Sequence, residues 1–540
     1  MAAVQHGTGL SVPARALQAV ALLAGFYLLA AAVVLGLLGL DVALYLGSDH
    51  LRAALFKIWA LTAVVIYPVL RVVFLTRRPK GGEAGGLPVT RADQPALWAR
   101  VDRIAELTGV RGPAELRLTA EVNAAVREDT RLLGLIPGKR HLEIGAPLLI
   151  GLTEAELDAV LAHEFGHFSH QDVRLAGVTV AGRTAILHSI GTLHERADRY
   201  QAEEEAEQRA LAEDRLARGR KPKAQDEATG GVQRVLAHMF TLYAKLFFRV
   251  SESVGRRQEY AADRAAAAIA GRDATASALR KIPTLAAAQS FYLDAYATVG
   301  WDAGLLPVPG QVYGGLARLL ADPARREELA ALGLALPEQA ADPYDSHPPI
   351  AQRVAAIEAL PADGRADAGA GPALGLLERP ERTLAALEKA TLVPEAAGKR
   401  RLDWPELVAE SHLAQAKAAA QPILRALTGS GRPGTVDALL DAVDRGEGPD
   451  LAGRLPADPA APAAPGRALR TATGRLVVLA LATAGLARWE LSWSSASALV
   501  LPEGMAERFD AALDAVAADA PDTGPLRALL AGAGLQPAAV

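Results

Sequence analysis

The sequence predicts a mainly helical α+β protein with a small sheet, two membrane-spanning helices before it and a helical region after it. Three observations predict this class. Residues 16–40 form an uncharged apolar run. Short alternating runs lie between segments of helical period. The chain is 51% hydrophobic with only 5% aromatic residues, and its alanine-rich composition favours closely packed helices. At 540 residues the chain exceeds one ordinary core, so several structural units are expected.

The first apolar run is long enough to cross a bilayer. As a helix, residues 16–40 would extend about 37 Å at about 1.5 Å per residue. The alternative is a cleaved secretory signal, whose apolar core is usually only about 7–15 residues. Residues 53–75 form a second candidate span, because Lys57 and Arg71 lie near its ends, where long side chains reach the lipid headgroups. A buried helix of a soluble protein is the alternative there. We expect a membrane hairpin over residues 1–80.

The flanking cations predict the orientation of this hairpin. Arg15 precedes the first span, and four cations follow or end the second: Arg71, Arg77, Arg78 and Lys80. By the positive-inside rule, both the N-terminus and everything after residue 80 face the cytoplasm. We therefore expect a multi-pass protein of the plasma membrane with the lipid bilayer as one partner. The net charge of −4 leaves no strongly basic surface, so nucleic acid is not an expected partner.

Residues 81–360 are expected to form one α+β domain. Residues 93–109 read as an amphipathic helix. Its apolar stripe consists of Leu97, Val101, Ile104 and Leu107. Alternating runs at 115–118 and 141–144 predict strands, and Pro137-Gly138 between them is a turn signal.

Two further regions are marked by composition. Residues 195–231 are dominated by charge, which is typical of a solvated helix or an insertion rather than a binding site. Residues 361–540 are expected to form an alanine-rich helical region whose role the sequence does not indicate. Within it, the apolar run 476–487 has 12 residues, which is too short to span a membrane, so we expect buried core.

The absence of cysteine limits the chemistry of any site. It excludes disulfides, iron–sulfur clusters, thiolate zinc sites and cysteine nucleophiles. A metal must therefore be held by histidine and carboxylate, and the chain has 11 histidines.

One such pattern is His163-Glu164-Phe165-Gly166-His167. It lies on an expected helix that begins with a capping box formed by Thr153 and Glu156. His163 and His167 are four residues apart, so both imidazoles project from one face and can bind one ion. Glu164 is placed to take a proton from water at the metal. Zinc is the expected ion, because imidazole and carboxylate ligands with one open position suit it. Two hydrogen-bonded structural histidines are the alternative.

A third ligand is expected on a later helix. Glu259-Tyr260-Ala261-Ala262-Asp263 follows an apolar-periodic run, and Glu259 can complete the set of three protein ligands. Asp263, one turn further on, can accept a hydrogen bond from a ligand histidine and fix its tautomer. Taken alone, these two acidic residues would be an ordinary solvated helix face, but together with the earlier motif they indicate a metal site.

These motifs resemble the HtpX and CAAX-prenyl-protease family of membrane zinc endopeptidases. The resemblance rests on H-E-F-G-H followed by E-Y-A-A-D after a membrane hairpin. Ser346-His347-Pro348-Pro349, followed by Arg353, resembles a later element of that family. Asn123-Ala124 resembles the pair on the strand that lines its substrate cleft. The resemblance covers residues 95–360 and the membrane hairpin.

The resemblance implies a zincin-like core of the gluzincin type. It implies one zinc ion bound by His163, His167 and Glu259, with Glu164 as general base. It also implies that His347 steadies the developing oxyanion and that Arg353 holds the His347 element, although a helix-entry role for His347 is the alternative. Family members often have two further membrane helices after the zinc helix, but charges interrupt residues 173–193, so no span is expected there.

The leading hypothesis is a cytoplasm-facing, membrane-anchored zinc endopeptidase. Its partners would be peptide or protein substrates, many of them membrane-associated, and the resemblance implies a role in membrane-protein quality control. The alternative is a membrane-tethered interaction protein whose region 361–540 binds a partner. A third possibility is a metal-dependent hydrolase of non-peptide substrates. The sequence does not predict the oligomeric state.

Overall fold

The computed structural model describes most of the chain outside the second expected span and the charged insertion. The described residues are 12–47, 85–131, 136–168, 230–334, 348–364, 371–456, 465–495 and 497–535, together with Trp59, Thr62, Ala63, Ile66, Tyr67, Ile186 and Gly191. The fold is mainly helical with small sheets, as expected. The predictions for residues 173–193, and for the charged insertion up to residue 229, concern positions that lie almost wholly outside the described residues.

A long N-terminal helix, α1 (Val12–Gly47), carries the first expected span. Within it, residues 24–47 are long and apolar enough to cross a membrane, with a mean hydropathy of 2.3. Large apolar side chains on this helix are exposed, for example Leu28 at 69% and Leu35 at 67%. Such a surface is typical of a helix that faces lipid. The second expected span is represented by only five described positions, so that prediction remains untested.

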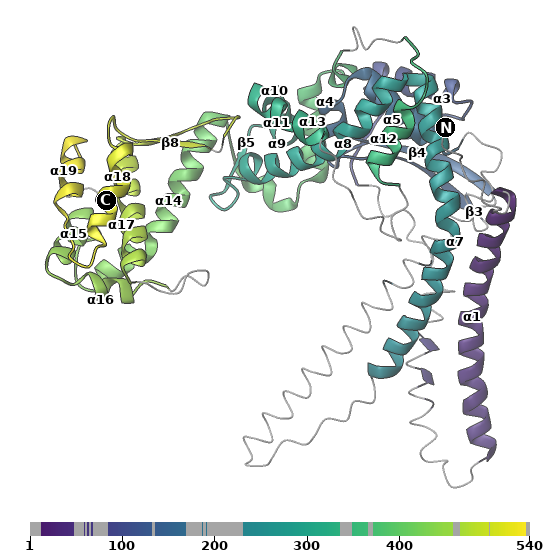
Figure 1. Ribbon diagram of the computed structural model, residues 1–540, viewed down its shortest axis with the longest axis horizontal. Helices are drawn as coiled ribbons and strands as arrows, with labels where there is room; N and C mark the ends of the chain where they lie inside the picture. Colours follow the sequence, from purple (N-terminus) through teal and green to yellow (C-terminus); the bar gives the residue numbers. More distant parts are fainter. Residues whose placement is uncertain are drawn as a thin grey trace, which may run out of the picture.

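The 41-residue helix α7 (Gly230–Ala270) packs along α1 with its first half (Figure 1). Ala244 and Phe247 are buried against Phe26 and Ala30 of α1. The Tyr243 hydroxyl donates a hydrogen bond of 2.8 Å to the Leu22 carbonyl. The second half of α7 enters the domain that contains the sheet, so one continuous helix joins the α1 contact to that domain.

The main sheet has four strands in the order β1-β2-β4-β3. The strands are β1 (Leu87–Val89), β2 (Glu115–Thr119), β3 (Ala124–Arg131) and β4 (Ile136–Gly145). Strands β2 and β4 contain the two predicted alternating runs and pair in parallel, with Leu116 opposite Leu142. Both leucines are fully buried. The predicted turn at Pro137-Gly138 is wrong: both residues lie inside β4, near its start, where strands tolerate proline.

Helices cover the apolar face of this sheet. They are α3 (Pro95–Leu107), α4 (Ala146–Gly151), α5 (Glu154–Gly166) and α8 (Arg272–Tyr292). The predicted helix over 93–109 is confirmed as α3, but its buried face contains Trp98 rather than Leu107, which is 55% exposed at the end of the helix. The capping box of α5 is confirmed: Thr153 and Glu156 each accept the other's backbone N–H, at 3.3 and 2.8 Å.

Smaller elements close this domain. They are a π-helical turn η3 (Leu293–Ala297), β5 (Leu305–Pro307), α9 (Gln311–Gly314), α10 (Leu316–Ala321), α11 (Pro323–Leu334), α12 (Ile350–Glu358), η4 (Ala373–Leu376), α13 (Pro380–Thr391), η5 (Pro394–Gly398) and β6 (Arg400–Leu402). Strands β5 and β6 form a parallel pair.

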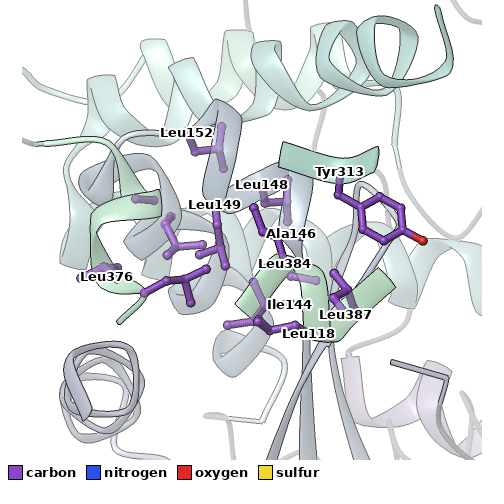
Figure 2. Close-up of a cluster of buried hydrophobic side chains, with 14 of the residues drawn as sticks. Leu118, Ile144, Ala146, Leu148, Leu149, Leu152, Tyr313, Leu376, Leu384 and Leu387 are labelled. Atoms are coloured by element: carbon purple, nitrogen blue, oxygen red, sulfur yellow. The ribbon is translucent and has the colours of Figure 1, made fainter. Parts of the chain in front are cut away.

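The hydrophobic core of this domain continues past residue 360. Figure 2 shows Leu384 and Leu387 beside Leu118 and Ile144 of the sheet, and Leu376 belongs to the same cluster. Backbone bonds also join residues 371–373 to the start of α5, because the Glu154 N–H donates to the Gly371 carbonyl at 2.9 Å. The expected domain boundary near residue 360 therefore does not coincide with a break in the packing, which extends to Leu407.

A second hydrophobic core lies between Ala420 and Leu535, and Figure 1 shows it as a separate lobe. We call residues 420–535 the C-terminal unit. Its elements are the second half of α14 (Trp404–Thr428), α15 (Val436–Asp444), α16 (Gly448–Gly453), α17 (Pro465–Thr483), the hairpin β7 (Arg488–Glu490) and β8 (Ala498–Val500), α18 (Ala506–Val516) and α19 (Gly524–Gly532). Five residues of the predicted buried run are among the most buried: Leu476, Val477, Leu479, Ala480 and Leu481.

Candidate metal centre

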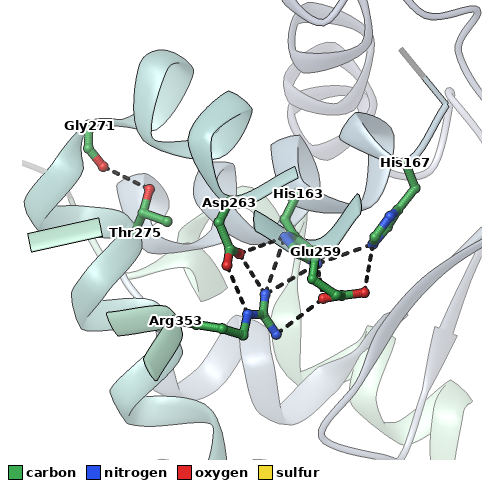
Figure 3. Close-up of polar contacts among 7 residues, drawn as sticks. All are labelled: His163, His167, Glu259, Asp263, Gly271, Thr275 and Arg353. Carbon is green, nitrogen blue, oxygen red and sulfur yellow. Dashed lines mark hydrogen bonds and ion pairs between the residues drawn. The ribbon is translucent and has the colours of Figure 1, made fainter. Parts of the chain in front are cut away.

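Three side chains from two helices converge on one point (Figure 3). His163 and His167 come from the last turn and C-cap of α5, and Glu259 comes from α7. The two histidine Nε2 atoms lie 3.2 Å apart. His163 Nε2 lies 3.5 Å from Glu259 Oε2, and His167 Nε2 lies 3.6 Å from Glu259 Oε1. Glu259 is 5% exposed, so its carboxylate is withdrawn from bulk water.

These three side chains can hold one metal ion. Bonds of about 2.0–2.1 Å at tetrahedral angles place ligand atoms about 3.3–3.4 Å apart, and the two histidine Nε2 atoms lie 3.2 Å apart. The two histidines face different oxygens of Glu259, and with one ligand atom taken from each residue all three atoms lie within 4.8 Å of one another. Among the described residues, these three also form the one cluster of histidine and carboxylate groups that can hold a metal ion. Three protein ligands leave a fourth tetrahedral position open, which is the arrangement of catalytic rather than structural zinc sites.

The close approach of α5 and α7 brings the ligands together. Gly166, the last residue of α5, faces Ala262 of α7. A Cβ atom on Gly166 would lie only 3.1 Å from the Ala262 Cα, inside the ordinary carbon–carbon contact distance of about 3.5–4.0 Å. Glycine at this position therefore sets the helix spacing. The metal-site motif identified the histidines around Gly166 but not this role of the glycine.

The first turn of α5 is fixed by α8. The Glu156 carboxylate is 2% exposed. It accepts hydrogen bonds from the Ser277 hydroxyl at 2.6 Å and from the Lys281 ammonium at 2.7–2.9 Å. The capping-box pattern predicted the bond of Glu156 to its own helix, whereas its contact with α8 has no local signal in the sequence.

A buried ion-pair network orients His163. Its Nδ1 lies 3.0 Å from Asp263 Oδ1, which leaves Nε2 facing Glu259 and His167. The Arg353 guanidinium donates to both Asp263 oxygens, at 2.9 and 2.6 Å, and lies 3.4 Å from Glu259 Oε2 (Figure 3). Such a bidentate contact fixes a carboxylate in one orientation. Arg353 on α12 thus contacts the groups around the metal ligands directly.

Charge in this network changes the pKa values of its members. Burial lowers the pKa of His163, but the Asp263 and Glu259 carboxylates raise it by more, to about 9. Burial raises the pKa of Asp263, but Arg353 and His163 lower it by more, to below its ordinary value. Asp263 is therefore held as a carboxylate beside His163. Burial lowers the pKa of Arg353, but Asp263 above all, then Glu259 and Glu164, raise it by more.

Strand β3 lies at one edge of the sheet, and α5 packs beside it. Asn123 is exposed immediately before β3, and Ala124 is buried at its first position. The Asn123 carbonyl accepts a hydrogen bond of 2.8 Å from the Gly145 N–H. Within the described part of the chain, β3 pairs only with β4, so its other edge has no strand partner there.

The structure does not describe His347, the expected oxyanion-stabilising residue. Ser346 and His347 lie outside the described residues, whereas Pro348 is buried just before α12.

Comparisons with known proteins point to one family. The sequence profile of peptidase family M48 matches residues 122–360. A protein named Protease HtpX homolog 1 from Streptomyces coelicolor is 32% identical over 252 residues, which are 46% of this chain and 73% of that protein. A protein of the same name from Saccharolobus solfataricus is 34% identical over 133 residues, 24% of this chain and 41% of its own length. Protease HtpX homolog from Acidiphilium cryptum is 28% identical over 203 residues, 37% of this chain and 61% of its own.

Proposed function

Because this chain belongs to peptidase family M48, we propose that it is a zinc-dependent endopeptidase anchored in a membrane. The observation that carries this proposal is the buried cluster of His163, His167 and Glu259, with spacings that suit one zinc ion per chain. Two imidazoles and one carboxylate are ligands that zinc accepts, and the absence of cysteine leaves this His/His/Glu set as the metal site.

The chain's own residues supply the rest of the chemistry. A bound zinc ion would contribute Lewis acidity, which polarises a peptide carbonyl and lowers the pKa of water. The Glu164 carboxylate takes a proton from the attacking water and passes it to the leaving amine. Asp263 lies beside Nδ1 of His163 and is itself held by Arg353, so Nε2 of His163 would be the atom that binds the ion. His347 is assigned to the developing oxyanion by family resemblance alone.

The substrate is an extended peptide that adds to the open edge of β3. Main-chain hydrogen bonds to an edge strand give affinity with little sequence preference, and Asn123 and Ala124 begin that strand. Since α5 packs beside β3, a peptide lying along the edge passes next to Glu164. This mode suits an enzyme that acts on many unfolded or misassembled chains.

Membrane-protein quality control is the proposed biological setting. It is supported by the relatives named Protease HtpX homolog and by the apolar helix α1, of which residues 24–47 can span a bilayer. The cations that flank the two expected spans favour a multi-pass protein of the plasma membrane with its peptidase domain in the cytoplasm. Membrane-associated proteins would then reach the site from the bilayer.

The variant Glu164→Gln tests the proposed chemistry. It should lower casein or peptide cleavage by about 10²–10⁴-fold while zinc, measured by elemental analysis, stays near one per chain. Glu154→Gln, at the start of the same helix and paired with Arg100, is the matched control and should keep full activity. Unchanged cleavage by Glu164→Gln would refute the general base, and wild-type protein without stoichiometric zinc would refute the metal assignment.

A second candidate function is an interaction protein whose C-terminal unit binds a partner. It is favoured by one observation: residues 420–535 have their own hydrophobic core and lie outside the matched family region. A chain ending at residue 417 separates the two readings. If cleavage of membrane substrates in cells survives this truncation, the interaction reading loses its basis. If cleavage is lost in cells while purified protein still cuts casein, that reading is favoured.

A further inference from the structure

In the part of the chain that the structure describes, the C-terminal unit is attached to the peptidase domain at two places. The first is α14, whose early residues Trp404 and Leu407 lie in the peptidase core and whose later residues Ile423 and Leu427 lie in the second core. The second is the loop 491–495 between β7 and β8, here called the tryptophan loop. Figure 1 shows the β7–β8 hairpin reaching from the C-terminal lobe toward the peptidase domain.

Trp493 of this loop enters an aromatic socket formed by Tyr292, Tyr296 and Trp404. Its ring stacks on Tyr296 at a centroid distance of 4.9 Å and an interplanar angle of 19°. It meets Trp404 edge to face, at 5.2 Å and 76°. Tyr292 in turn stacks on Tyr296, at a centroid distance of 6.3 Å and an interplanar angle of 14°. The three socket residues are all at most 3% exposed, so Trp493 covers a built, rigid surface.

Polar contacts fix the backbone of the loop over this socket. The Tyr296 hydroxyl lies 2.7 Å from the Ser492 carbonyl and 2.9 Å from the Ser495 carbonyl, so it can donate to either. Arg325 donates from Nε to the Trp493 carbonyl at 3.2 Å. Tyr296 is 1% exposed with the loop in place. If the loop left, its hydroxyl would lose both of these acceptors.

The socket lies at the C-terminal end of α8, and α8 also contacts α5, the helix that carries the two histidines. Tyr292 is the last residue of α8, and Tyr296 belongs to the π-helical turn η3 that continues it. In the first half of α8, Ser277 and Lys281 bind Glu156 in the first turn of α5. Turns of π type are rare and frequently lie at functional sites. Here the turn presents Tyr296 to the tryptophan loop.

We propose that the tryptophan loop is a conformational latch that couples the C-terminal unit to the zinc helix through α8. With Trp493 in the socket, η3 is held and α8 is tied at both ends. Without it, the C-terminal unit moves about α14, η3 relaxes, and the Glu156 contact of α8 with α5 loosens. This role goes beyond peptide hydrolysis, because it makes the C-terminal unit a regulator of the metal centre's rigidity.

Spin labels on full-length protein test the docking. The chain has no cysteine, so Ala330→Cys on α11 and Ala506→Cys on α18, both exposed, give two unique labelling sites. Pulsed electron paramagnetic resonance should show one narrow distance distribution in the parent and a broad one after Trp493→Ala. Trp493→Phe keeps an aromatic ring in the socket and should restore the narrow distribution. An unchanged distribution in Trp493→Ala would overturn the latch.

Trp489→Ala is the matched control, because it removes the same side chain from the same hairpin. Trp489 stacks on His412 of α14 rather than on the socket, and this variant should keep the narrow distribution. Equal broadening by both variants would overturn the role assigned to Trp493.

Hydrogen exchange and zinc binding test the coupling to the metal centre. In Trp493→Ala, amides in α8 and in the first turn of α5 should exchange about tenfold faster, and zinc should bind at least several-fold more weakly. Broadened label distances without either change would refute the coupling. The label distances and the hydrogen exchange need neither zinc nor hydrolysis, so these two readouts test the latch even if the Glu164 experiment refutes the proposed metal chemistry.

Discussion

Replacing Gly166 with alanine should weaken zinc binding at least tenfold while the chain stays folded. A Cβ atom there would lie 3.1 Å from the Ala262 Cα and 3.3 Å from its Cβ. Because carbon atoms pack at about 3.5–4.0 Å, α5 and α7 must separate by a few tenths of an ångström. His163 and His167 lie on one side of this contact and Glu259 on the other, so the separation is transmitted to the ligand spacing.

The expected tenfold loss of zinc affinity follows from the narrow range of ligand distances that a metal site accepts. Ligand distances in zinc sites hold to about ±0.2 Å, and disturbing the groups that position a ligand typically costs about 10–100-fold in metal affinity. The effect on folding is smaller. Crowding a packed contact costs about 1–3 kcal/mol, and alanine regains up to about 1 kcal/mol over glycine in a helix. The net loss of roughly 2 kcal/mol or less leaves a protein of ordinary stability folded.

Competition with a chromophoric chelator measures the zinc Kd, and circular dichroism checks the fold. Gly453→Ala is the matched control: Gly453 is also the last residue of a helix, α16, and a Cβ there would meet nothing within 4 Å. The control should bind zinc as the wild type does. A wild-type Kd in Gly166→Ala, with the fold intact, would refute the view that this helix contact sets the ligand geometry.

Three further outcomes are expected. A chain ending at residue 364 loses six buried leucines of the first core, whose burial contributes roughly 10 kcal/mol to the free energy of unfolding. This chain should not fold, whereas a chain ending at residue 417 should fold, and circular dichroism distinguishes the two outcomes. Lys281→Met leaves the buried Glu156 carboxylate without its cation. The free energy of unfolding, measured in urea, should fall by about 1–3 kcal/mol, and an unchanged urea midpoint would contradict this. Burial raises the pKa of Glu388 above 4.5, so its folded form binds a proton more tightly. Wild-type stability should therefore fall relative to Glu388→Gln as pH rises through and above 4.5, and a pH-independent difference would refute the assignment.

The sequence was most informative where function depends on residues within one helix. The spacing of His163 and His167 needs only the helical repeat, and the capping box at Thr153 and Glu156 is a pattern four residues long. Alternation likewise located β2 and β4. Their parallel pairing, with β3 at the edge, could not be predicted in the same way, because register depends on contacts between segments that no local pattern links.

The extent of the peptidase domain illustrates the same limit. Residues 361–371 are rich in glycine and alanine, and such composition favours a linker. The chain nevertheless returns after it, so that residues 371–373 bond to the start of α5 and Leu384 packs beneath the sheet. In an alanine-rich helix, no local sequence pattern identifies the leucines that pack into a core formed by distant segments. Only the tertiary contact distinguishes them from leucines of a separate unit.

These long-range contacts explain why the metal centre depends on residues far from its motif. The helix α5 carries two of the proposed ligands and is held by several elements, among them residues 371–373 at its start, α8 through Glu156, and α7 at Gly166. The third ligand, Glu259, belongs to α7, which also packs on α1. A tolerance of about ±0.2 Å must therefore be maintained across elements from most of the chain. It follows that substitutions at any of these holding points should act first on zinc affinity, and on hydrolysis only as a consequence.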